Sequence, residues 1–215
     1  LPVLAAIVLV SVPLVRAQAP PPFTVEEMLK LKRISDPRLS PDGTRIAYVV
    51  TQVDLDGNKR RSEIRVAPLS GGPARTFEGT APRWSPDGKQ LAFLGSDSDL
   101  RIHALDTPVT RTPRTLPTGV WGVTWSPDGK WIAFVSEVFP ECSGNVVGDA
   151  ACNESLLKKQ QASKTKARVI DNLLFRHWTS WKDGLYSHLF VMLADGSAPP
   201  RDLTPGRSDV PPFSL

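Results

Sequence analysis

The sequence predicts an all-β fold built from β-propeller blades, because one phrase recurs along it at a regular spacing. Ser-Pro-Asp-Gly occupies residues 40–43, 85–88 and 126–129, and a short apolar run containing Ala and an aromatic residue follows each copy. Successive copies are 45 and 41 residues apart. This matches a four-stranded blade of roughly 40 to 50 residues. Closed propellers have about four to eight blades, so we expect an incomplete ring here.

The repeated phrase has the chemistry of a tight hairpin. Proline presets φ for the second turn position, aspartate can bond nearby backbone, and glycine adopts the left-handed conformation. The apolar runs at residues 46–50, 91–94 and 132–135 then read as inner strands packed between sheets. A weaker second hairpin follows the first copy at residues 64–77, and another lies at residues 189–204. Each repeat therefore predicts one blade.

The third repeat is longer than the others. Ser126 and Ser214 are 88 residues apart with no phrase between them, and residues 209–215 read as the approach to a fourth phrase. We expect residues 35–215 to form a partial propeller of three blades and the start of a fourth, with a helical insertion at about 137–182. The whole chain then reads as a fragment of a longer protein.

The first residues resemble a targeting segment. Residues 1–15 are a continuous apolar stretch, and small-residue sites follow at Ala17 and Ala19. Residues 1–17 predict a signal peptide cleaved after Ala17, with a membrane anchor as the alternative. The signal reading predicts a periplasmic or secreted protein that does not associate with a membrane after cleavage.

Residues 18–34 predict a short helical segment before the first blade. Thr24 and Glu27 have the spacing of a capping box. An apolar face follows, and we expect the helix to dock through it; it consists of Val25, Met28, Leu29 and Leu31.

Cys142 and Cys152 enclose a short polar loop inside the predicted insertion. In an exported protein we expect them to form a disulfide. Zinc binding is a weaker alternative, because two thiols ten residues apart with no nearby His make a poor ligand set. Free thiols are the third possibility, should the signal peptide prediction be wrong.

The net charge of +4 is modest for 215 residues. Its one basic run, at residues 158–168, predicts a solvated helix rather than a nucleic-acid surface. We expect no nucleic-acid partner, no metal and no cofactor.

Three parts of the sequence together resemble a known family: residues 23–37, the three Ser-Pro-Asp-Gly repeats, and residues 174–191. The chain resembles exported bacterial peptidases of the prolyl oligopeptidase family (S9), of the dipeptidyl and acylaminoacyl peptidase type, from residue 23 to 215. The resemblance implies an N-terminal propeller that admits only unfolded peptides to a Ser-Asp-His triad in a C-terminal α/β-hydrolase domain.

The catalytic part of that family is not in this sequence. An α/β-hydrolase nucleophile lies in Gly-x-Ser-x-Gly, which occurs nowhere here. None of the three histidines, His103, His177 and His188, matches the catalytic one of the family. We expect no catalytic residue in this chain, while the longer protein acts as a serine exopeptidase.

The candidate functional residues are therefore binding residues. Cations, indoles and a carboxylate gather in eight positions, enough to hold a peptide end by charge and aromatic contact. They are Arg176, His177, Trp178, Trp181 and Asp183. Alternatively, the two tryptophans pack the insertion on a blade, and Asp183 and Gly184 form a hairpin turn.

Two functions follow from these observations. The first is a propeller that gates peptide substrates for its own C-terminal hydrolase domain. The second is a non-catalytic, TolB-like periplasmic propeller that serves as a scaffold for other proteins. The Arg-His-Trp segment and the single helix before the blades favour the first.

Overall fold

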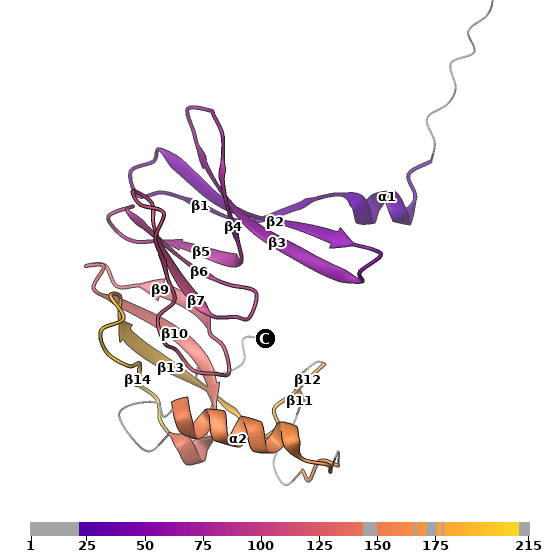
Figure 1. The fold of residues 1–215 in the computed structure, drawn as a ribbon, viewed down its shortest axis with the longest axis vertical. Helices are drawn as coiled ribbons and strands as arrows, with labels where there is room; N and C mark the ends of the chain where they lie inside the picture. The colour runs from indigo at the N-terminus through magenta and orange to yellow at the C-terminus, as the bar shows by residue number, and fades with distance from the viewer. Residues whose placement is uncertain (1–21, 144–149, 166, 171–175, 178, 211–215) are drawn as a thin grey trace, which may run out of the picture.

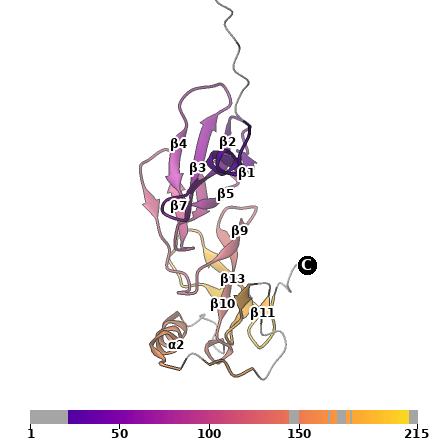
Figure 2. The same cartoon turned by 90° about the vertical axis from the view of Figure 1, so that its right-hand side faces the viewer.

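The computed structural model describes residues 22–143, 150–165, 167–170, 176–177 and 179–210. The predicted signal peptide, and residues 211–215 of the approach to the fourth phrase, lie outside these residues. The described chain forms three four-stranded antiparallel sheets and one two-stranded hairpin. The sheets follow one another along the long axis of the molecule and do not close into a ring (Figure 1, Figure 2).

Each sheet is one propeller blade, with strands paired in chain order. The first contains β1 (Arg33–Leu39), β2 (Arg45–Asp54), β3 (Lys59–Pro68) and β4 (Arg75–Glu78). The second contains β5 (Thr80–Trp84), β6 (Gln90–Leu94), β7 (Leu100–Ala104) and β8 (Thr110–Arg111). The third contains β9 (Trp121–Trp125), β10 (Trp131–Val138), β13 (Tyr186–Leu193) and β14 (Arg201–Asp202). The predicted fold class is confirmed.

The Ser-Pro-Asp-Gly phrase closes the first hairpin of every blade in the same way. The glycine N–H donates to the serine carbonyl at 2.9 Å in all three copies. The glycine φ angles are 68°, 69° and 71°, in the left-handed region. The serine hydroxyl donates to the aspartate at 2.5, 2.6 and 2.6 Å, and accepts the backbone N–H five residues later at 2.9 Å. The same hydrogen bonds thus hold the turn in all three blades.

Because of these turn aspartates, we expect the folding stability of the protein to decrease at acidic pH. The hydroxyl of Ser40, with donors from Thr44, lowers the pKa of Asp42 from 3.8 to about 2. A carboxyl group whose pKa is lower in the folded than in the unfolded state stabilises the fold at any pH above its unfolded-state pKa. This stabilisation is lost as the pH falls through the folded-state pKa. We expect the urea midpoint to fall between pH 3.8 and about 2 and the decline to be shallower in Asp42→Asn. Asp106→Asn, a change at an exposed aspartate outside these turns, should keep the wild-type profile; identical acid limbs for all three proteins contradict the prediction.

Strand β6 joins the two hydrophobic cores because both of its faces are buried. Leu91 and Phe93 pack with apolar side chains of the first blade, while Ala92 and Leu94 pack with those of the third. Alternation along a strand sends successive side chains to opposite faces. A short run with no polar position therefore predicts a strand between two sheets, as β6 is.

Tryptophans of the repeat also connect neighbouring blades. The indole N–H of Trp84 donates to the carbonyl of Arg38 at 2.9 Å, and that of Trp125 to the carbonyl of Arg83 at 3.1 Å. Arg83 in turn pairs with Asp36 at 2.7 Å. In the second and third repeats, the tryptophan that precedes the Ser-Pro-Asp-Gly phrase thus forms a hydrogen bond to the preceding blade.

Helix α1 (Val25–Lys30) begins as predicted, with the Thr24 hydroxyl accepting the backbone N–H of Glu27 at 3.2 Å. The expected docking of its apolar face is not seen: no residue of the helix is buried, and Val25 is 63% exposed. The chain becomes extended at Leu31 and enters β1 at Arg33, within the predicted helical segment. The helix lies beside the end of β2 in the first blade, with its side chains largely exposed (Figure 1).

The insertion lies between β10 and β13, within one blade, at residues 139–185. It contains η1 (Pro140–Cys142), α2 (Ala150–Ala162), β11 (Arg176–His177) and β12 (Ser180–Trp181). Only the first part of the basic run 158–168 is helical, so the helix prediction for that run is corrected. A disulfide joins Cys142 to Cys152, and the Asn153 side chain accepts the N–H of Phe139 at 2.9 Å. None of the described helices is long and apolar enough to span a bilayer.

Candidate functional site

The β11–β12 hairpin brings together three of the predicted binding residues. Arg176 is paired with Trp181 across the hairpin. Its guanidinium carbon lies 5.3 Å from the centroid of the indole, and that of Arg168 lies 4.4 Å away. Arg168 also donates to Asp183 at 2.6 and 3.3 Å. We call Arg168, Arg176, Trp181 and Asp183 the hairpin cluster.

The other predicted residues give less information. His177 belongs to β11, but its side chain lies outside the described part of the structure, as does all of Trp178. Asp183 and Gly184 adopt φ angles of 48° and 85° and form a turn, as the alternative interpretation expected. Trp181 is 39% exposed and lies against two guanidinium groups.

A partly buried ion pair attaches the hairpin cluster to the third blade. The Lys182 ammonium lies 2.7 Å from Asp209 and 3.4 Å from Glu137 of β10. Only 11% of the Lys182 side chain is exposed. Asp209 also accepts the backbone N–H of Ser187 at the start of β13, at 2.8 Å. These contacts fix β12 relative to the blade, so the neighbouring Trp181 is held in place.

The hairpin cluster has the chemistry of a carboxylate site. Stacking on the indole orients the guanidinium of Arg176. Arg176 forms no ion pair with any residue that the structure describes. An oriented guanidinium can bind a carboxylate through two parallel hydrogen bonds. Arg168 was missed in the sequence, because its partners lie 13 and 15 positions further on and no local pattern links them.

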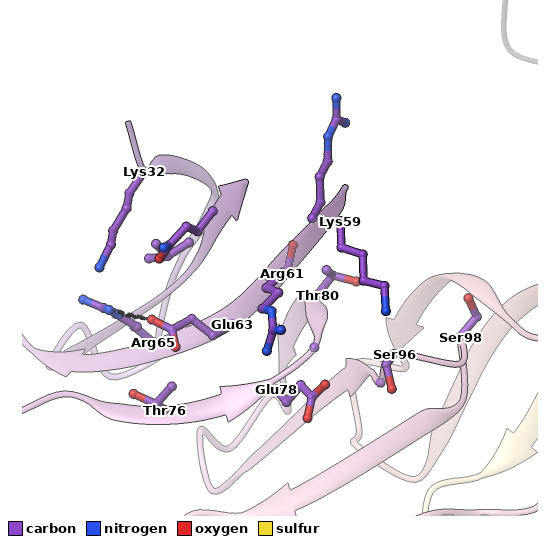
Figure 3. Close-up of a pocket in the computed structure, with 16 residues that line it drawn as sticks. Lys32, Lys59, Arg61, Glu63, Arg65, Thr76, Glu78, Thr80, Ser96 and Ser98 are labelled. Atoms are coloured by element: carbon purple, nitrogen blue, oxygen red, sulfur yellow. Dashed lines mark hydrogen bonds and ion pairs between the residues drawn. The ribbon is translucent and has the colours of Figure 1, made fainter. Parts of the chain in front are cut away.

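A second site lies on the first blade and was not predicted. An open groove of about 1020 Å³ runs along β3 and reaches the β6–β7 turn, where Ser96 and Ser98 lie (Figure 3). Five of its lining residues are cationic, and two, Glu63 and Glu78, are acidic. We call it the blade-1 groove; its cations are Lys32, Lys59, Arg60, Arg61 and Arg65.

Both sites lie at the same end of the blades. The groove includes Lys59, the residue that follows the β2–β3 connection, and the β10–β13 connection contains the hairpin cluster. These are the connections between the second and third strands of their sheets, and both face the right-hand side of Figure 1. That end of the structure thus presents several cations. Within the described residues, no group of three or more His, Cys, Asp or Glu side chains could hold a metal ion.

Comparison with curated proteins finds relatives among the peptidases. The chain is 26% identical to dipeptidyl-peptidase 5 of Porphyromonas endodontalis over 177 residues, 79% of this chain and 24% of that protein. It is 27% identical to dipeptidyl-peptidase 5 of Porphyromonas gingivalis, over 81% of this chain and 25% of that protein. The uncharacterized peptidase YuxL of Bacillus subtilis is 33% identical over 46% of this chain and 16% of its own length.

The relatives of this chain are peptidases. The resemblance to the propeller region of S9 peptidases is confirmed; it was drawn from residues 23–37 and 174–191 together with the repeats. The chain spans about a quarter or less of the length of these relatives. No family model matches the sequence.

Solved structures share the fold at lower sequence identity. An acylaminoacyl peptidase in complex with Z-Gly-Gly-Phe-chloromethyl ketone aligns with a TM-score of 0.61 and 20% identity, over 80% of this chain and 25% of that one. The AtxE2 isopeptidase aligns with a TM-score of 0.53 and 18% identity, over 86% of this chain and 32% of that one. At these identities the likeness concerns the fold alone.

Proposed function

We propose that this chain is the substrate-gating propeller of a secreted serine peptidase of the S9 type. The observation that carries the proposal is the series of four-stranded blades in a chain whose sequence relatives are peptidases more than about three times as long. In this proposal a hydrolase domain elsewhere in the longer protein cleaves short peptides. A serine attacks the peptide carbonyl, a histidine takes its proton, and an aspartate orients the histidine.

The propeller contributes selection rather than chemistry. Each blade packs against the next through apolar cores, and indole hydrogen bonds tie the blades together. Rigid, packed blades would let an extended peptide reach the catalytic site more readily than a folded domain. Selection by size then precedes the acyl-transfer step.

The hairpin cluster would hold one end of the peptide. In this role the guanidinium of Arg176, oriented by the indole of Trp181, binds a carboxylate of the substrate. Because these contacts are made equally in the ground state and the transition state, they lower KM and leave kcat unchanged.

Arg176→Ala tests this role in the longer protein. We expect KM for a peptide substrate to rise about tenfold or more, the value of at least one hydrogen bond to a charged group, with kcat unchanged. Arg201→Ala removes an exposed cation from β14 and serves as the control, with both constants unchanged. A fall in kcat at constant KM, or equal effects of the two variants, contradicts the proposed role of Arg176.

The reaction class is tested with the product of the complete gene. A fluorophosphonate probe should label one serine, and labelling should abolish hydrolysis of a dipeptidyl chromogenic substrate. A protein that is neither labelled nor active contradicts the peptidase proposal and favours the TolB-like scaffold. Export is tested separately: the mature protein should begin at Gln18 and appear in the periplasm or medium.

A further inference from the structure

We propose that the blade-1 groove is a binding site for acidic peptide segments. The site is distinct from the hairpin cluster and lies on the first blade rather than the third. It needs no catalytic domain in order to bind. The proposal therefore goes beyond gating and can be tested by binding alone.

One face of β3 is apolar and packs on the second blade, whereas the other is charged and lines the groove, unlike a face that packs on a blade. Ile64 and Val66 point into the core shared with the second blade and are 0% and 3% exposed. The alternate positions Lys59, Arg61 and Arg65 share the opposite face with Glu63. Packing an apolar sheet on this face would remove four charges from water, at a high desolvation cost. A charged partner suits it better.

The cations of the groove exceed the acids available to neutralise them. Arg65 pairs with Glu63 (Figure 3), and the largely exposed Arg61 lies 3.3 Å from Asp54. Lys32 and Lys59 form no ion pair with any residue in the described part of the chain. Their ammonium groups are on different sides of the groove, Lys32 beside Arg65 and Lys59 toward Ser96 (Figure 3). Two carboxylates of one extended peptide could bind them.

The other lining groups favour a peptide over a nucleic acid. None of the described residues that line the groove is aromatic, so no platform for base stacking is present. Glu63 and Glu78 can each accept a peptide N–H, whereas a phosphodiester backbone has no N–H to donate to them. The hydroxyls of Thr80, Ser96 and Ser98 can both donate to and accept from a peptide backbone. Charge and hydrogen bonding therefore both suit an acidic peptide.

The test measures binding of a fluorescein-labelled decapeptide of alternating Glu and Gly to the full-length protein. A Gln-Gly decapeptide is the neutral probe, and an oligothymidylate of equal charge is the nucleic-acid probe. We expect the Glu peptide to bind at least about tenfold more tightly than the other two, and binding to weaken as salt increases. Equal binding of the Glu and Gln peptides, or tighter binding of the oligothymidylate, overturns the proposal.

Charge reversal then locates the site. Lys59→Glu with Arg61→Glu should weaken binding of the Glu peptide at least about tenfold, since two attractive contacts become repulsive. Lys59→Gln with Arg61→Gln is the gentler variant, expected to fold normally and to lose several-fold in affinity. Lys89→Glu with Lys130→Glu makes the same charge change at the Ser-Pro-Asp-Gly turns and should bind as wild type. If the neutral variant binds as wild type, or if the turn variant loses as much as the groove variants, the site is not this groove.

Discussion

Phe134→Ala is expected to lower the free energy of unfolding by about 3 to 5 kcal/mol, the range for deleting a buried aromatic ring. Phe134 is 0% exposed and lies opposite Phe190, with ring centroids 5.6 Å apart. Both rings belong to the core shared by the second and third blades. Alanine leaves a cavity there that rigid sheets on both sides cannot fill by collapse.

Guanidinium denaturation of the full-length protein measures the change. Phe23→Ala removes the same ring from a position that is 69% exposed, and we expect a loss within about 0.5 kcal/mol. A loss below about 1 kcal/mol for Phe134→Ala, comparable with that for Phe23→Ala, contradicts the packing of these two blades.

His188→Ala is expected to cost about 3 to 5 kcal/mol, because it strands a buried charge. The His188 ring, 0% exposed, lies 2.7 Å from the carboxylate of Asp202 and 3.1 Å from the carbonyl of Gly206. Asp202 also accepts the N–H of Thr204 at 2.9 Å, and its side chain is only 2% exposed. Without the imidazole, this carboxylate loses its only described side-chain partner.

The double variant His188→Ala with Asp202→Ala completes a thermodynamic cycle. Because it removes both partners, we expect it to be more stable than the sum of the single losses predicts, by about 1 kcal/mol or more. Additive losses measured by denaturant unfolding would show that the two side chains do not interact, contrary to the structure.

The blades could be predicted because their information is local. Ser-Pro-Asp-Gly closes its own turn through bonds within six residues, and the apolar run after it has the pattern of a buried strand. The missing repeat after Ser126 predicted an insertion at about 137–182, and residues 139–185 lie between β10 and β13. The position of α1 could not be predicted in the same way, since its apolar face indicates only that burial is favourable and not which surface provides it.

The functional sites depend on contacts between residues that lie far apart in the sequence. The segment at residues 176–183 was visible as a cluster of unusual residues, but the cation–π contact with Arg168 depends on how the insertion folds back. The blade-1 groove is similar: alternate charges along β3 indicate a polar face, but Ser96 and Ser98 reach it only through the stacking of two blades. Such sites require the tertiary structure.

In the proposed function, the propeller selects peptides by size before a serine peptidase cleaves them. The most direct test uses the product of the complete gene and one cleavable sequence, presented in peptides of increasing length and in an exposed loop of a folded domain. We predict efficient cleavage of the short peptides, a decline with length, and no cleavage of the folded domain until it is unfolded. If the folded domain is cleaved as fast as the short peptides are, the propeller does not select substrates by size.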